Sequence, residues 1–112
     1  MESFDRFDVV RVPFPFTDRQ ADKVRPALVL SDRKGFSATS GHSVMAMITS
    51  AAHPPWPLDV PIADLSSAGL PAASRVRFKL FTLDHRLVRG RLGRLAEADR
   101  ASVTAAVRRL MP

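Results

Sequence analysis

The chain contains no cysteine. This absence excludes a disulfide framework, a thiolate metal site and a cysteine nucleophile, and it suits a reducing compartment. Long apolar stretches are also missing, since none approaches the ~20 residues that a membrane-spanning helix needs. The N-terminal MESFDRFD carries acidic residues where a signal peptide would have a basic start. We therefore expect a soluble, cytoplasmic protein.

Internal repeats, low-complexity segments and signs of a second domain are absent as well. A chain of 112 residues can bury one core without help from metals or disulfides, so we expect a single domain over residues 1–112. Acidic residues number eleven against seventeen lysines and arginines, for a formal net charge of +6. This surplus favours a polyanionic partner such as nucleic acid, although ordinary solubilising charge explains it as well.

The stretch KVRPALVLS, residues 23–31, predicts a deeply buried strand with a cationic entry. Its apolar run from Pro26 to Leu30 does not alternate with polar residues, which is typical of a strand covered on both faces. Pro26 lacks a backbone donor and is tolerated as the first residue of a strand, so Lys23 and Arg25 lie at its mouth. Cover for Val29, and for Met45 and Met47 of the next apolar run, must come from a partner chain or from a helix.

A second apolar run, Val44 to Ile48, ends in Thr49 and Ser50. The spacing predicts a hairpin, and a turn centred near Ser37 would make Arg25 and Thr49 cross-strand neighbours. Directly opposite residues share a face with Cβ atoms ~5 Å apart, so a permanent cation and a hydroxyl would together bind a phosphate. The connecting loop is rich in Gly, Ser and Thr, which predicts either a mobile lid over RNA or a simple connector.

Four segments together resemble one protein family: DVVRVPFPF at residues 8–16, VRPALVLS at 24–31, MITS at 47–50 and LGRL at 92–95. In this order they are similar to the MazF/PemK family of toxin endoribonucleases of type II toxin–antitoxin systems, over about residues 7–110. The resemblance implies a mainly β fold, an SH3-like small antiparallel β-barrel with a C-terminal α-helix, that forms a homodimer. It also implies cleavage of single-stranded RNA (mRNA) without a metal or other cofactor, and neutralisation by a small acidic antitoxin.

The resemblance assigns catalytic roles to Arg25 and Thr49. RNA is cut by its own 2′-hydroxyl when that group is deprotonated, the phosphorane is stabilised and the leaving 5′-oxygen is protonated. A guanidinium binds phosphate through a planar fork and stays charged, so Arg25 suits charge stabilisation and is a poor base. The general base stays open among His42, His53 and His85, of which His53 is nearest to Thr49 in sequence, or a weak base aided by positioning.

Aromatic rings occur in two proline-braced segments. Phe14 and Phe16 follow a first strand predicted at 8–13, and Trp56 lies in the loop HPPWP. Such rings can stack on bases at ~1–3 kcal/mol per base, although contacts in the core, a dimer or an antitoxin complex are equally compatible.

The segment SRVRFK, residues 74–79, alternates, so Arg75, Arg77 and Lys79 share one face. Charges ~7 Å apart along a strand could follow an RNA backbone, or simply form a solvated face. In total, the residues that we expect to contact RNA are Phe14, Phe16, Thr17, Lys23, Ser50, His53, Trp56, Ser74, Arg75, Arg77 and Lys79.

The rest of the chain predicts two further strands and a helix. A short edge strand is expected at 58–62 because of Pro61, the segments 81–84 and 87–95 complete the sheet, and 96–110 is a helix without a side-chain cap at Ala96. The competing functional classes are a non-catalytic nucleic-acid-binding module and a gyrase-poisoning toxin of similar fold. The latter would depend on the C-terminal helix rather than on Arg25 and Thr49.

Overall fold

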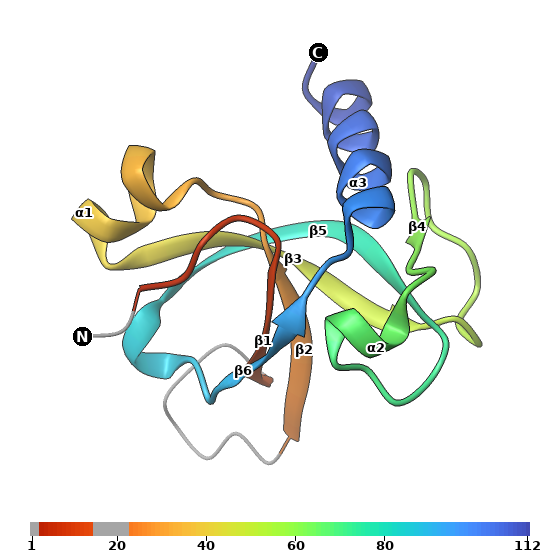
Figure 1. Ribbon diagram of the computed structural model, residues 1–112, viewed down its shortest axis with the longest axis horizontal. Coiled ribbons are helices and arrows are strands. Elements are labelled where there is room, and N and C mark those ends of the chain that lie inside the picture. Colours follow the sequence, from red (N-terminus) through yellow and green to blue (C-terminus); the bar gives the residue numbers. More distant parts are fainter. Residues whose placement is uncertain (1–2, 15–22) are drawn as a thin grey trace.

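The computed structural model describes residues 3–14 and 23–112, whose strands form one strongly curled antiparallel sheet with a helix at its C-terminal end (Figure 1). The sheet order is β4-β5-β3-β2-β1-β6. The strands are β1 (Asp8–Phe14), β2 (Lys23–Val29), β3 (His42–Ser50), β4 (Val60–Pro61), β5 (Ser74–Asp84) and β6 (Arg91–Arg94). The helical segments are η1 (Arg33–Ser37), α1 (Ala38–Ser40), α2 (Leu65–Ala68), η2 (His85–Leu87) and α3 (Glu97–Leu110). This half-barrel with its C-terminal helix confirms the expected fold class.

The sheet is covered on both faces, but at different places. Leu28 lies in a core that includes Ile48, Val76 and Val103, so it packs toward α3. Its neighbours in β2 face the other way, into a second core. That second core consists of Phe4, Val10, Val12, Ala27, Val29, Met45 and Leu83. The uninterrupted apolar run in β2 is explained by these two cores, as predicted.

The second core corrects one expectation. Val29 and Met45 are completely buried within the chain itself, so neither side chain needs cover from a partner or from the helix. A homodimer therefore cannot be argued from these residues.

The β2–β3 hairpin has the predicted register. Ala27 pairs with Met47, Leu28 with Ala46 and Val29 with Met45. Continued in this register, Arg25 and Thr49 would face one another, but the ladder stops at Ala27 and Met47. The two strands therefore separate just before Arg25 and Thr49.

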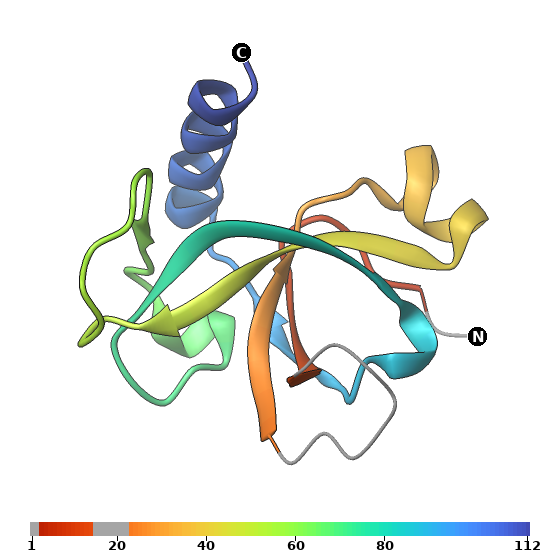
Figure 2. The same cartoon turned by 180° about the vertical axis from the view of Figure 1, so that it is seen from behind.

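The β2–β3 connection is helical rather than irregular. The Asp32 side chain caps η1 by accepting a hydrogen bond of 2.6 Å from the backbone N–H of Gly35. The Ser43 hydroxyl then links the Ser37 hydroxyl (3.1 Å) to Nε2 of His85 (2.7 Å) inside the protein. In both ribbon views α1 lies on the opposite side of the molecule from α2 and β4 (Figures 1 and 2). Because α1 precedes β3 and Thr49 is near the end of β3, this connection lies away from Thr49, and its role as a lid over RNA or as a connector stays a prediction.

Several boundaries differ from the sequence prediction. Strand β2 begins at Lys23 rather than at Pro26, so Arg25 lies within the strand and pairs with Val12 of β1. Phe14 still belongs to β1 and pairs with Lys23, and its ring is 40% exposed. Phe16 and Thr17 lie outside the described residues. The two predicted segments at 74–79 and 81–84 form one strand, β5, which carries an irregularity opposite Ala46 and Met47. Such a bulge strengthens the local twist and helps the sheet to curl.

Helix α2 and strand β6 pack closely against one another. A Cβ atom on Gly93 would lie 2.4 Å from the carbonyl oxygen of Ser67, so only glycine permits this approach. Helix α3 begins without a side-chain cap at Ala96, as expected. Its buried Asp99 instead accepts hydrogen bonds from the backbone N–H groups of Ala63 (3.0 Å) and Asp64 (2.9 Å) and so fixes the segment after β4.

Candidate active site

A pocket of about 330 Å³ opens where β2 and β3 separate, and we call it the strand-mouth pocket. Its polar lining residues are Arg25 from β2, Thr49 and Ser50 from β3, Ser74 from β5, and His53. The segment Leu70–Ala73 and the strand residues Pro26, Met47 and Ile48 complete its wall. The structure therefore brings Arg25 and Thr49 into one pocket, although they are not a hydrogen-bonded pair of the ladder.

His53 is joined directly to Thr49. Its ring nitrogen Nδ1 lies 2.5 Å from the Thr49 hydroxyl oxygen, and its backbone N–H donates to the Ser50 carbonyl at 3.1 Å. This second bond closes a turn right after β3, which returns the imidazole to the end of the strand. Sequence proximity alone favoured His53, and the geometry now couples it to the hydroxyl.

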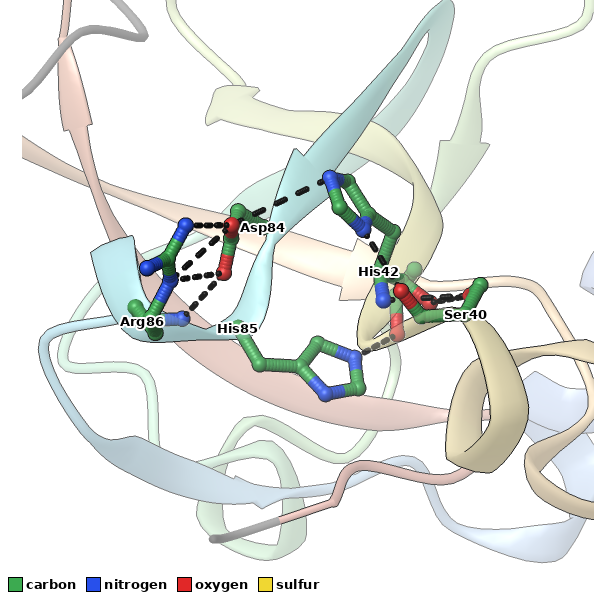
Figure 3. Close-up of polar contacts among 6 residues, drawn as sticks. Ser40, His42, Asp84, His85 and Arg86 are labelled. Carbon is green, nitrogen blue, oxygen red and sulfur yellow. Dashed lines mark hydrogen bonds and ion pairs between the residues drawn. The ribbon is translucent and has the colours of Figure 1, made fainter.

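The other two histidines of the chain lie at the far end of β3 (Figure 3). His42 begins that strand, seven residues before Thr49, which corresponds to ~23 Å along a strand. His42 approaches Asp84, and the hydrogen bonds from Arg86 hold the pKa of the Asp84 carboxyl at about 2. The buried His85 bonds to Ser43 and packs edge-on against the Phe4 ring. Neither imidazole reaches the strand-mouth pocket.

The cationic face of β5 is partly offset by Asp59, which the sequence prediction did not include. Arg77 donates to both carboxylate oxygens of Asp59, at 3.2 and 2.9 Å, and Arg75 lies 3.6 Å away. The Arg77 hydrogen bonds are the main reason why the pKa of Asp59 is lowered. Both guanidinium groups also donate to backbone carbonyls, those of Ala51 and Pro54. The alternation in SRVRFK is correct, two of the three cations on this face share one carboxylate, and their contact with RNA stays a prediction.

Trp56 is placed by the same loop. Its backbone N–H donates to Asp59 at 3.0 Å, and Lys79 Nζ lies 4.5 Å from the centre of its ring. The ring remains 43% exposed. A base could stack on it and a protein partner could cover it, so its role stays a prediction.

A family model described as PemK-like, MazF-like toxin of type II toxin–antitoxin system matches residues 5–111. The chain belongs to this family.

Solved structures share its fold. A MazF from Deinococcus radiodurans is 24% identical with a TM-score of 0.74, covering 99% of this chain and 98% of that one. A MazE–MazF structure from the same organism gives 23% identity and a TM-score of 0.73 over 99% and 97% of the two chains. An endoribonuclease in complex with its cognate antitoxin from Mycobacterial species gives 18% and 0.71 over 96% and 91%. No curated protein sequence matches significantly.

The cations of this PemK/MazF family member differ in whether they have an acidic partner. Within residues 3–14 and 23–112, Lys23 and Arg25 form no ion pair, whereas Arg75, Arg77, Arg86, Arg91 and Arg94 all do. The same residues contain no cluster of three or more histidine and acidic side chains that could hold a metal ion, and no helix long and apolar enough to span a bilayer. Among the described cations without an ion pair, Arg25 is the one that lines the strand-mouth pocket.

Proposed function

We propose that this toxin-family chain is a sequence-specific endoribonuclease that cleaves single-stranded RNA by attack of the 2′-hydroxyl on the adjacent phosphate. The observation that carries the proposal is the meeting of Arg25 with the hydrogen-bonded pair of Thr49 and His53 in one pocket. The attack breaks the bond from phosphorus to the 5′-oxygen and leaves a 2′,3′-cyclic phosphate and a 5′-hydroxyl. No metal is needed for this chemistry.

Each of the three side chains has a distinct role. Arg25 binds the non-bridging phosphate oxygens and stabilises the charge of the phosphorane. With His53 Nδ1–H donating to Thr49 Oγ1, the threonine hydroxyl proton can donate to the phosphate. In this tautomer His53 Nε2 carries no proton and accepts the one released by the 2′-hydroxyl, while the leaving 5′-oxygen takes a proton from water.

The test is cleavage of a long unstructured RNA by the pure protein in EDTA, followed by mapping of the product ends. Arg25→Ala should lower the rate by ~10²-fold or more, and Arg25→Lys should recover only part of it because lysine lacks the planar fork. Thr49→Ala should be the next most damaging change and Thr49→Ser mild. Arg108→Ala, which removes an exposed arginine of α3, is the matched control.

Two results would contradict the proposal. One is a wild-type rate from folded Arg25→Ala protein, and the other is a set of products with 3′-hydroxyl ends. RNA that is bound but never cut would favour the binding module instead.

The family also supports a homodimer neutralised by a small acidic antitoxin. Light scattering at micromolar concentration should return twice the 12.3 kDa of the chain, and a well-behaved monomer would count against the dimer. For the antitoxin we propose an acidic C-terminal segment that folds across the cationic pocket and excludes RNA.

A further inference from the structure

A second hollow of about 240 Å³ adjoins the strand-mouth pocket. The two share Arg25, Pro26, Leu70 and Pro71, so these residues form the boundary and Arg25 contacts both spaces. The remaining lining of the second hollow is Arg11, Val24, Gly69 and Leu92. It is therefore apolar apart from two arginines.

Arg11 is the charged exception inside a buried strand. Val9, Val10 and Val12 have no exposed surface, while Arg11 is exposed. Its backbone is fixed on the β6 side, because its N–H donates to the Gly90 carbonyl at 2.8 Å and its carbonyl accepts from Arg89 at 2.7 Å. In the described part of the chain its guanidinium has neither an ion pair nor a hydrogen bond. A permanent cation on a rigid strand thus lacks a protein partner.

The register places the two arginines on neighbouring strands. Arg11 is the cross-strand partner of Pro26, the residue next to Arg25. Side chains alternate along a strand, so Arg11 and Arg25 leave the sheet on opposite faces. Both nevertheless line the second hollow, and Arg25 also lines the strand-mouth pocket. An RNA held by Arg25 at this boundary can therefore present a neighbouring phosphate to Arg11.

We propose that the second hollow binds the nucleotide next to the scissile phosphate, with Arg11 on its phosphate and the apolar wall of Val24, Leu70 and Leu92 against its base. This inference rests on the proposed ribonuclease function, because it uses Arg25 as the ligand of the scissile phosphate. Arg11 is then a positioning residue for the substrate. It adds ground-state binding and leaves the chemical step unchanged.

The test uses RNA oligonucleotides centred on the mapped cut site, with a single 2′-deoxy nucleotide there to prevent cleavage. Three lengths are compared by fluorescence anisotropy: the minimal core, the core extended by one nucleotide at its 5′ end, and the core extended at its 3′ end. Arg11→Ala should weaken binding of one extended oligonucleotide about tenfold and leave the core within about twofold. For that oligonucleotide the salt dependence should also fall by ~0.7 in slope, as expected for one lost phosphate contact.

Cleavage gives the second readout. With all-ribose versions, Arg11→Ala should raise KM for the same extended substrate and leave kcat unchanged. Arg11→Lys should retain part of the affinity, since the charge remains. Arg108→Ala makes the same change in net charge at a distant site and should have no length-dependent effect.

The inference is overturned if Arg11→Ala affects core and extended oligonucleotides equally, since the variant would then alter the pocket itself, or if it affects none of them. Failure of the proposed function has a different signature. Folded Arg25→Ala protein would then cut the all-ribose oligonucleotides at the wild-type rate, while wild-type protein would still bind the deoxy-containing ones with the predicted length dependence.

Discussion

Thr49 and His53 are separated by four residues and joined through their side chains, so the chemistry of one is set by the other. In the tautomer proposed above, Nδ1 donates to Oγ1, so the hydroxyl proton can point to the phosphate and Nε2 carries no proton. At the scale of single residues this is the feature that distinguishes the strand-mouth pocket from a simple phosphate site. Arg25 alone would bind RNA without accepting a proton.

His53→Ala should therefore lower kcat by ~10²-fold or more, the usual contribution of a positioned acid or base. The measurement is kcat on an all-ribose RNA for both proteins. His42→Ala serves as the control, because that imidazole lies at the other end of β3. A wild-type kcat in folded His53→Ala would remove His53 from the mechanism.

At the scale of elements, the hairpin was predictable and its surroundings were not. A glycine- and serine-rich turn between two apolar runs determines the β2–β3 register, because the pairing must keep both runs buried. The sequence does not show that the ladder ends at Ala27 and Met47, since strand separation depends on the walls contributed by α2 and β5. It also hides the second core, because Phe4 and Leu83 are nearly eighty residues apart and carry no common pattern.

The brace that Asp59, in the loop before β4, forms with Arg77 and Arg75 of β5 was not predicted from the sequence, for a similar reason. Asp59 is an ordinary loop acid in the sequence, and only the fold places it against Arg77 and Arg75, with 8% of its side chain exposed. Because two guanidinium groups are held there, the alternation of SRVRFK overstated the free positive charge of β5.

This brace should make stability depend on acid pH. The folded-state pKa of Asp59 lies below its usual value of 3.8, chiefly because of the Arg77 hydrogen bonds. Its stabilising contribution is therefore complete above that value and is lost as the pH falls through the lower folded pKa. Urea unfolding between pH 7 and pH 2 should show a steeper acid loss for the wild type than for Asp59→Asn, which is already destabilised at pH 7. Glu97→Gln, at an exposed acid of α3, should keep the wild-type slope, and an identical slope in Asp59→Asn would disprove the brace.

At the scale of the whole molecule, the formal net charge is +6 and ion pairs engage only part of the cations. Asp8 binds Arg91 and Arg94, and Asp59 and Asp84 bind arginines of β5 and η2. Arg11 and Arg25 have no ion pair among the described residues, and they differ from surface cations such as Arg108 because they line adjoining hollows. A polyanion of either kind, RNA or an acidic protein segment, should therefore be drawn to that end of the molecule.

Antitoxin and RNA should consequently exclude one another at that end. The probe is the acidic C-terminal segment of the protein encoded beside the toxin gene, titrated against toxin that holds a labelled, non-cleavable RNA. We expect full displacement, and we expect Lys23→Glu to weaken the segment more than Arg75→Glu, because Asp59 already occupies Arg75. Arg108→Glu controls for net charge. If segment and RNA bind together, or if charge reversal at Lys23 weakens the segment no more than at Arg108, the antitoxin acts from another surface and inhibits without covering Arg25.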